Sequence, residues 1–291
     1  MKCISIILSG GTGSRMNMDI PKQYIEVNDR MIITESIRPF LECEFVSDVQ
    51  IVADEMWREK IIDEYRVLSD YYMGEMKLSI SMSDSTEGSM DFSTDVVDAA
   101  WPLEDRAVYE NDHVRNCDEE GLYKFHGFSD PGDNRQLSIL NGLKDVYGDC
   151  CDSVNGAFDK DVLVIVHDAA RPLVSVALIS ACINACEGHD GVMPVLPMKD
   201  TVYLSEDGKA VSSLINRDQI FAGQAPEVYR LERYLKACEK LLPDKIIDIR
   251  GSTEPAIMDG MDIVMVPGDE GNFKITTRAD LERYIELVGT E

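Results

Sequence analysis

The residues best suited to chemistry form a glycine-rich segment near the N-terminus. Ser9-Gly10-Gly11-Thr12-Gly13-Ser14-Arg15 directly follows the apolar run Ile4–Leu8, and Lys22 comes seven residues after Arg15. Glycines let a backbone approach a phosphate closely, and successive N–H groups can form a concave anion site. We expect this segment to bind a nucleotide, with Arg15 and Lys22 neutralising its phosphates. The expected nucleotide-binding residues here are Ser9, Gly10, Gly11 and Gly13.

Two common phosphate-binding loops do not fit this spacing. A dinucleotide fingerprint needs a small residue where Met16 stands, and a P-loop needs a Gly-Lys-Ser/Thr string that the segment lacks. Two cations separated by Pro21 suit a triphosphate better than a pyrophosphate bridge. The plainer alternative is a strand-to-helix turn with charged surface residues.

Short β-branched runs alternate with helix-period segments, which is typical of βαβ units on a mostly parallel sheet. We predict an α/β fold, a Rossmann-like three-layer sandwich, in one domain over residues 1–291. The predicted strands are Ile4–Leu8, Val49–Val52, Lys77–Met82, Val162–Val166, Gly191–Val195 and Ile263–Val266. The predicted helices are Met31–Leu41, Met56–Ser69, Gln136–Val146, Val174–Ala185, Val228–Leu242 and Arg278–Val288. A hairpin is expected from Thr201–Leu204 and Ala210–Leu214, turning at Asp207-Gly208.

One segment breaks the alternation. Asp84–Asp133 holds 14 Asp or Glu against three basic residues and shows little sustained period. A loop of this length inside a compact domain is generally functional, disordered or an insertion. We predict an acidic surface insertion over 84–133; its aromatic residues leave a lid or a partner surface as the alternative.

Composition narrows the possible partners. The 291 residues carry 28 Lys and Arg against 54 Asp and Glu, a net charge of −26. Nucleic acid and anionic membranes reward positive charge, so neither is expected as a partner. The eight cysteines show no CxxC spacing, and Cys182 and Cys186 lie at helical spacing among apolar residues, which predicts core positions. No apolar run is long enough to span a membrane. We expect a cytoplasmic protein.

The glycine segment, read on through Pro21-Lys22-Gln23-Tyr24, resembles the opening of the sugar-phosphate nucleotidyltransferases. The resemblance is to the cytidylyltransferases that act on 2-C-methylerythritol 4-phosphate or ribitol 5-phosphate. Further matching strings follow in the same order along the chain. They are Arg135-Gln136-Leu137-Ser138, His167-Asp168-Ala169-Ala170-Arg171-Pro172, Lys199-Asp200-Thr201, Gly223-Gln224-Ala225-Pro226 and Asn272-Phe273-Lys274-Ile275-Thr276.

The resemblance implies transfer of CMP from CTP to a polyol phosphate, with release of pyrophosphate. Asp168 ends a predicted buried strand, at the sheet edge where open α/β sheets bind ligands. A carboxylate there can hold Mg²⁺ against a triphosphate, so Asp168 is the expected metal ligand; a helix N-cap is the alternative. The attacking phosphate oxygen is already anionic, so no general base is needed and His167 is expected only to orient the turn.

The resemblance also assigns roles to the remaining residues. Arg135 and Ser138 are expected near the cytidine, and Arg171 and Thr201 at the acceptor. Lys274 joins Arg15 and Lys22 as an expected catalytic cation; the alternative for it is a solvated lysine on an edge strand.

Residues 199–221 resemble the family's projecting β-hairpin arm, which interlocks two subunits. A homodimer with exchanged arms would carry Arg217 to the acceptor phosphate in the partner's site. An ordinary edge hairpin is the alternative.

The matching strings do not all point to the same acceptor substrate. The His-Asp-Ala-Ala-Arg-Pro string resembles the methylerythritol branch, which supplies isoprenoid precursors, whereas Asn216-Arg217-Asp218 with Gly223-Gln224 resembles the ribitol branch, whose CDP-ribitol serves cell-surface polymers. We favour methylerythritol phosphate, because the stretches around Arg171 and Thr201 follow that pattern.

The chain departs from the family at two places. Ala225-Pro226-Glu227 stands where many relatives have Thr-Pro-Gln, and Gly271 where an aspartate is common. A second metal carboxylate is therefore in question. The rival functions are an NAD-dependent oxidoreductase, which the missing third glycine disfavours, and a non-catalytic nucleotide-binding module, which would not need the cations.

Overall fold

The computed structural model describes residues 2–11, 20–83, 121–150 and 161–289. Within this part of the chain, a central sheet has the strand order β10-β7-β11-β6-β1-β4-β5. An eighth strand, β12, also pairs with β7. β1, β4, β5 and β6 run parallel, and β12 is parallel to β7, whereas β10 and β11 are antiparallel to their neighbours. The strands are β1 (Cys3–Leu8), β4 (Asp48–Val52), β5 (Phe125–Ser129), β6 (Leu163–Asp168), β7 (Gly191–Pro197), β10 (Phe221–Gly223), β11 (Glu227–Arg230) and β12 (Ile263–Pro267).

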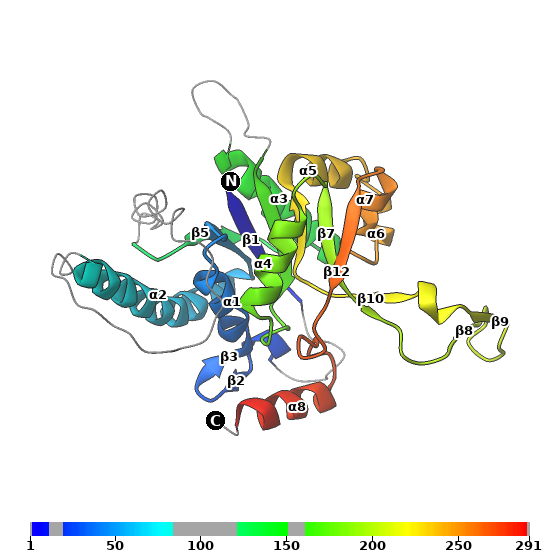
Figure 1. The fold of residues 1–291 in the computed structure, drawn as a ribbon, viewed down its shortest axis with the longest axis horizontal. Coiled ribbons are helices and arrows are strands. Elements are labelled where there is room, and N and C mark those ends of the chain that lie inside the picture. The colour runs from blue at the N-terminus through cyan, green and yellow to red at the C-terminus, as the bar shows by residue number, and fades with distance from the viewer. Residues whose placement is uncertain (1, 12–19, 84–120, 151–160, 290–291) are drawn as a thin grey trace, which may run out of the picture.

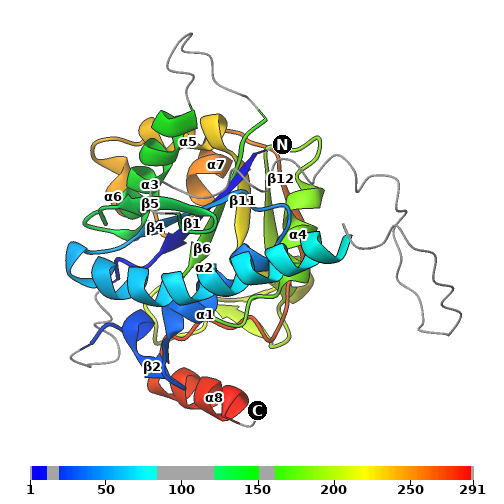
Figure 2. The same ribbon diagram turned by 90° about the vertical axis from the view of Figure 1, so that its left-hand side faces the viewer.

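Helices cover both faces of the sheet (Figures 1 and 2). Alternate residues of β1 show why, because Ile4 and Ile6 belong to one apolar cluster and Cys3 and Ile7 to the other. One layer holds α1 (Ile32–Glu42), α2 (Glu55–Ser83) and α4 (Val176–Ala185), and the other holds α3 (Arg135–Cys150), α5 (Leu231–Glu239), α6 (Lys245–Asp248) and α7 (Glu254–Met258). This arrangement confirms the predicted three-layer α/β class. Cys182 and Cys186 are buried in the first layer, as predicted.

Most predicted elements lie within a few residues of the observed ones, and α8 (Arg278–Val288) matches its predicted bounds. Two predictions were wrong. Lys77–Met82 is not a strand but the end of α2, because extending an existing helix costs less than nucleating a new element. Val228–Arg230 is not helical: it lies in β11, which pairs with both β6 and β7.

The predicted acidic loop over 84–133 is too long at its C-terminal end. β5 lies inside it and pairs with β4 in the central sheet. Lys124, one of its three basic residues, is buried and donates to the carbonyl oxygens of Leu41 and Cys43 at 2.9 and 2.8 Å, at the end of α1. Residues 84–120 lie outside the described part of the chain.

The predicted hairpin is present as β8 (Val202–Leu204) and β9 (Ser213–Ile215), an antiparallel pair separate from the central sheet. Figure 1 shows it projecting from the body of the molecule. Its turn contains Gly208 at φ +70°, and Asp207 accepts hydrogen bonds from the backbone N–H groups of Lys209 and Ala210 at 2.8 and 2.9 Å. In the ranges that the structure covers, no helix combines the length and apolarity that crossing a bilayer requires.

Candidate active site

A cavity of about 610 Å³ opens beside the carboxyl ends of β1 and β6. Leu8 and Asp168 end these strands and are register partners, so both parallel strands deliver their following residues to one edge. Residues predicted from four separate strings line this cavity. They are Gly10, Gly11, Lys22, Arg135, Ser138, Asp168 and Lys274.

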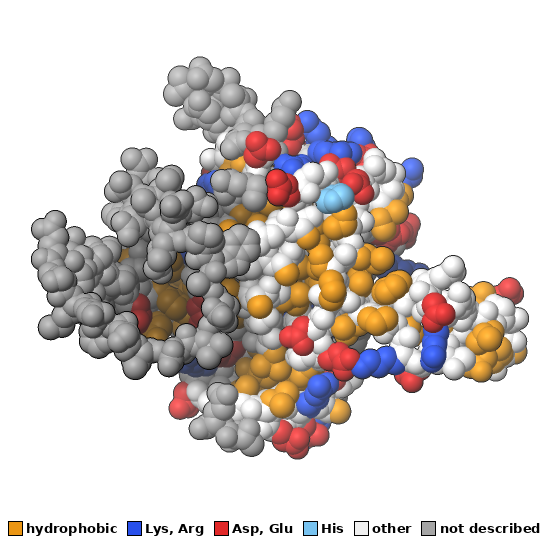
Figure 3. Space-filling model, in the orientation of Figure 1, with side chains coloured by type: hydrophobic (Ala, Val, Ile, Leu, Met, Phe, Trp, Pro, Cys, Tyr) orange, Lys and Arg blue, Asp and Glu red, His pale blue; other side chains and the backbone are white. Residues whose placement is uncertain are grey.

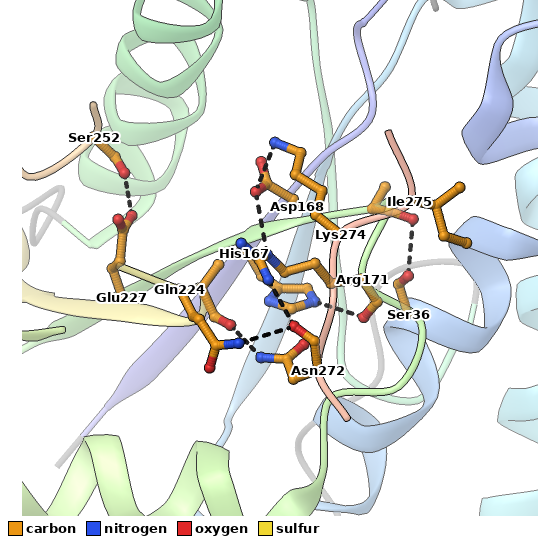
Figure 4. A network of polar contacts seen from close by, with 12 residues as sticks. Ser36, His167, Asp168, Arg171, Gln224, Glu227, Ser252, Asn272, Lys274 and Ile275 are labelled. Carbon is orange, nitrogen blue, oxygen red and sulfur yellow. Dashed lines mark hydrogen bonds and ion pairs between the residues drawn. The ribbon is translucent and has the colours of Figure 1, made fainter. Parts of the chain in front are cut away.

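Asp168 is the centre of the charged network (Figure 4). Its Oδ1 accepts hydrogen bonds from Arg135 Nε and Nη2 at 3.2 and 3.0 Å, and its Oδ2 accepts one from Lys274 Nζ at 2.9 Å. Arg171 Nε lies 3.7 Å from Oδ2. Burial disfavours the charged carboxylate, but Arg135, Lys274 and Arg171 outweigh it and hold the pKa of Asp168 well below its usual value. The carboxylate is therefore ionised at neutral pH.

The described part of the glycine segment is held from behind by Gln23 and Tyr24. Gln23 Nε2 donates to the carbonyl oxygen of Gly11 at 2.7 Å and also to that of Ser9, and Tyr24 OH donates to Ser9 O at 3.0 Å. A Cβ on Gly10 would lie 2.4 Å from Pro131 Cβ, so only glycine fits there. Ser9 does not line the cavity; it is buried and its hydroxyl donates to Val52 O at 2.7 Å. Gly13 and Arg15 lie outside the described residues.

Lys22 and Lys274 belong to neighbouring segments of the wall. Lys22 lies in the short 3-10 helix η2 (Lys22–Tyr24), and its Nζ donates to the carbonyl oxygen of Ile275. Lys274 precedes Ile275 directly, and both lysines line the cavity. This contact brings together the segments that carry Lys22 and Lys274, two predicted catalytic residues that are 252 positions apart in sequence.

The N-terminus of α3 forms another part of the wall. Asn134 Oδ1 accepts a hydrogen bond from Leu137 N at 2.8 Å, which satisfies a donor of the first turn. Ser138 Oγ donates to Asn134 O and accepts from Gly132 N, both at 3.0 Å. A Cβ on Gly132 would lie 2.4 Å from Leu137 Cβ, so this turn also requires glycine. The sequence analysis missed Pro131, Gly132 and Asn134, although Pro-Gly followed by a capping Asn is a recognisable turn and helix start.

Comparison with known proteins identifies the family of this chain. Residues 127–286 match the family model described as 2-C-methyl-D-erythritol 4-phosphate cytidylyltransferase. The chain belongs to that family.

Full-length relatives show the same likeness. The protein named 2-C-methyl-D-erythritol 4-phosphate cytidylyltransferase from Geotalea uraniireducens is 24% identical over 296 residues, covering 100% of both chains, and that from Rubrobacter xylanophilus is 27% identical over 285 residues, covering 96% of this chain and 91% of the relative. The bifunctional enzyme IspD/IspF of Maricaulis maris is 25% identical, and this chain spans 58% of its length.

Solved structures confirm the fold. The 4-diphosphocytidyl-2C-methyl-D-erythritol synthase of Anaerococcus prevotii matches with a TM-score of 0.66 at 20% identity, covering 99% of this chain and 96% of that one. The 2-C-methyl-D-erythritol 4-phosphate cytidylyltransferase of Francisella tularensis matches with a TM-score of 0.62 at 20% identity, covering 98% of each chain.

Three predicted acceptor residues of this cytidylyltransferase-family chain do not line the cavity. Arg171 packs behind Asp168 with its side chain 11% exposed, and its Nη1 donates to Asn272 O at 2.6 Å. Thr201 and Arg217 are exposed at the base of the arm, where Arg217 Nη1 donates to Lys199 O at 2.9 Å.

His167 holds the turn that carries Asp168. The ring is fully buried against Phe40, at 5.0 Å between centroids, and its Nε2 lies 3.2 Å from Arg171 O. Burial lowers the pKa of His167 to about 4, so the ring is neutral at pH 7. Ser36 Oγ supports the same turn by donating to Ala169 O at 2.8 Å. These contacts suit a residue that orients the turn.

The two positions at which the chain departs from the family pattern, Ala225-Pro226-Glu227 and Gly271, have different neighbours in the structure. Glu227 is buried beside Ser252, whose hydroxyl donates to it, and burial raises the pKa of Glu227. Asp269 Oδ1 accepts a hydrogen bond from Gly271 N at 2.7 Å. The cavity wall instead contains Asp54, which the sequence analysis missed although it follows a predicted strand.

The donor set fits a divalent cation that arrives with a nucleotide. Among the described residues, no group of three His, Cys, Asp or Glu side chains is placed to hold a metal ion. Asp168 is nevertheless an ionised carboxylate on the cavity wall. Mg²⁺ is commonly bound by one or two carboxylates together with substrate phosphates, so a single ionised carboxylate on this wall is compatible with such a cation.

Asp168→Asn should lower the free energy of unfolding at pH 7 by up to about 3–5 kcal/mol, because it removes the counter-charge of Arg171 and of the partly buried Arg135 and Lys274. The folded pKa of Asp168 lies well below its unfolded value near 4, so the stabilisation is complete above that pH. It declines as pH falls below about 4 and is lost fully only below the folded pKa, so the difference between wild type and variant should narrow below pH 4. Urea unfolding from pH 7 to pH 3 measures the start of this narrowing. Asp133→Asn, an exposed acid on the same cavity, is the matched control and should change stability by less than about 0.5 kcal/mol. Equal losses in both variants would contradict the assignment.

Proposed function

We propose that the chain is a cytidylyltransferase that moves CMP from CTP to 2-C-methyl-D-erythritol 4-phosphate and releases pyrophosphate. The observation that carries the proposal is that Lys22, Arg135, Asp168 and Lys274 line one cavity, in a member of this family. The NAD-dependent oxidoreductase is disfavoured by family membership. The ribitol 5-phosphate alternative is not favoured either, since the relatives compared above carry the methylerythritol name.

The chemistry follows from the charges. An oxygen of the acceptor's phosphate attacks the α-phosphorus of CTP, and the bond from that phosphorus to the pyrophosphate oxygen breaks. Two anions must approach each other, so the protein's contribution is positioning and charge neutralisation. Lys22 and Lys274 lie on one wall, where they can neutralise the reacting phosphates. Arg135 and Ser138, in the first turn of α3, are proposed to bind the cytidine end of the nucleotide.

Asp168 is proposed to hold Mg²⁺, which when bound supplies further positive charge to the triphosphate. Arg171 does not line the cavity, so it is proposed to act at the acceptor from behind Asp168, whose Oδ2 lies 3.7 Å from its Nε. No proton transfer is required of His167, in agreement with its lowered pKa and full burial.

The arm is proposed to complete the site of a second subunit. Thr201 and Arg217 do not line the cavity of their own chain, and the arm exposes large apolar side chains, orange at the right of Figure 3, that water does not favour. These are Tyr203, Leu204, Val211 and Leu214. A homodimer that exchanges arms would cover them and bring Arg217 to the partner's acceptor. The cytoplasmic location, the single domain and the acidic insertion stay predictions.

The function is tested by pyrophosphate release with CTP, Mg²⁺ and each acceptor in turn. Methylerythritol phosphate should support release and ribitol 5-phosphate should not. Release only with ribitol 5-phosphate would overturn the acceptor, and no release with either would overturn the reaction.

Lys22→Ala should lower kcat by about 10²–10³-fold, the cost of one electrostatic donor at a reacting phosphate. Lys60, an exposed lysine paired with Glu26, offers the matched control, and Lys60→Ala should leave kcat unchanged. Thermal melts of both variants show whether the fold is kept. A folded Lys22→Ala protein with wild-type kcat would remove Lys22 from the mechanism.

Subunit mixing tests the exchanged arm. Arg217→Ala and Lys274→Ala should each be nearly inactive alone, because each removes one contribution from every site. If arms cross between subunits, mixed dimers contain one intact site, and an equal mixture should recover about a quarter of wild-type activity. Mixtures that stay as inactive as the separate variants would show that Arg217 does not act in a partner's site.

A further inference from the structure

Gln224 clamps the backbone of the loop that follows β12. It is buried, 6% exposed, and does not line the cavity. Its Oε1 accepts a hydrogen bond from Asp269 N at 3.0 Å, and its Nε2 donates to Asp269 O at 2.9 Å and to Asn272 O at 3.3 Å. A Cβ on Gly268 would lie 2.4 Å from Gln224 Oε1, so any other residue there would displace the Gln224 amide. One amide therefore fixes both ends of a short turn.

Asn272 closes the same turn and extends it to Arg171. Its side chain has no solvent exposure, and its Nδ2 donates to Ala225 O at 2.7 Å. Its backbone carbonyl accepts from Arg171 Nη1 at 2.6 Å. The guanidinium proposed to meet the acceptor is thus oriented by a carbonyl whose position depends on Gln224 and on Asn272 itself (Figure 4).

Lys274 lies between this turn and a second fixed point. Ile275 N donates to Ala170 O at 2.8 Å, and Ile275 O accepts from Lys22 Nζ. The segment is therefore held before and after Lys274, and the lysine has to point at Asp168, 2.9 Å away. Freeing the first attachment would leave Lys274 held on one side only.

We propose that Gln224 and Asn272 are positioning residues, which hold Lys274 and Arg171 in a single arrangement around Asp168. The kinetic consequence rests on the proposed function. Misplacing a catalytic group by about 1 Å can cost about 10²-fold in rate, even when the altered residue does not touch substrate. The loss should fall on kcat and on the KM for the acceptor, while CTP, bound mainly by the glycine segment and α3, should bind almost as before.

The first test is Gln224→Met, which keeps the length of the side chain and removes all three hydrogen bonds. We expect kcat to fall about 10–100-fold and the acceptor KM to rise, with the KM for CTP changing by less than about threefold. Hydrogen exchange of the backbone amides over residues 268–275 should become faster. Gln50→Met is the matched control: Gln50 is buried and donates to Ser129 Oγ at 2.7 Å on β5, away from this loop. It should leave both the kinetics and the exchange over 268–275 at wild-type values.

The second variant, Gln224→Glu, tests the positioning role independently if the methionine variant does not fold. An ionised carboxylate still accepts from Asp269 N but faces the carbonyl oxygens of Asp269 and Asn272. Protonation restores one donor, so the activity of Gln224→Glu relative to wild type should rise as pH falls from 8 to 6. A residue that contributes only general stability would not produce this pH profile.

The outcomes separate the two proposals. Unchanged exchange over 268–275 in Gln224→Met, or faster exchange with wild-type kcat and acceptor KM, overturns the positioning role. A uniform rise in the KM for both substrates with constant kcat also overturns it. If wild type releases no pyrophosphate, the proposed function fails. Hydrogen exchange of the backbone amides over residues 268–275 then still tests whether Gln224 holds the loop.

Discussion

The buried carboxylate of Asp168 is the interaction on which the rest of the site depends. Arg135, Arg171 and Lys274 come from three segments, and their charges would repel one another without an anion between them. Removing four charged groups from water is costly, and only close pairing offsets that cost. The central strand β6 and the turn after it therefore determine where each cation lies. The three cations can lie close together because the carboxylate of Asp168 lies between them.

The helix most remote from the sheet also contributes to this arrangement. Ile275, next to Lys274, is buried with Ile32, Leu281 and Tyr284 in a small apolar cluster that joins α1 to α8. Thr276 lines the cavity, and its hydroxyl donates to Asp280 at 2.7 Å within the capping region of α8. The start of α8 and the position of Lys274 are thus set by adjacent residues. A helix whose own residues do not line the cavity thus holds one side of its wall.

The sequence predicts this molecule best where a local pattern has a local cause. Strand β6 and Asp168 at its end follow from an apolar run that stops at a charge, and α8 follows from a capping residue and helical spacing. The Gln23 contacts and the Lys22–Ile275 contact join distant segments, and no spacing along the chain reports them. Asp54 was missed for the same reason, since only the strand order places β4 beside β1. Seven of the sixteen residues that line the cavity are site residues expected from the sequence, whereas tertiary contacts place Ser9 and Arg171 behind its wall.

A net charge of −26 and a polyanionic substrate are compatible because the two act over different distances. Surface charges more than about 8 Å apart are largely screened at physiological ionic strength. The contacts within the cavity are near 3 Å and partly buried, where each charge counts for more than on the open surface. Binding is therefore governed by the few cations around Asp168 rather than by the excess of acids elsewhere. The same reasoning explains why composition disfavours nucleic acid, which needs a broad basic surface, but says little about a nucleotide held in a single cavity.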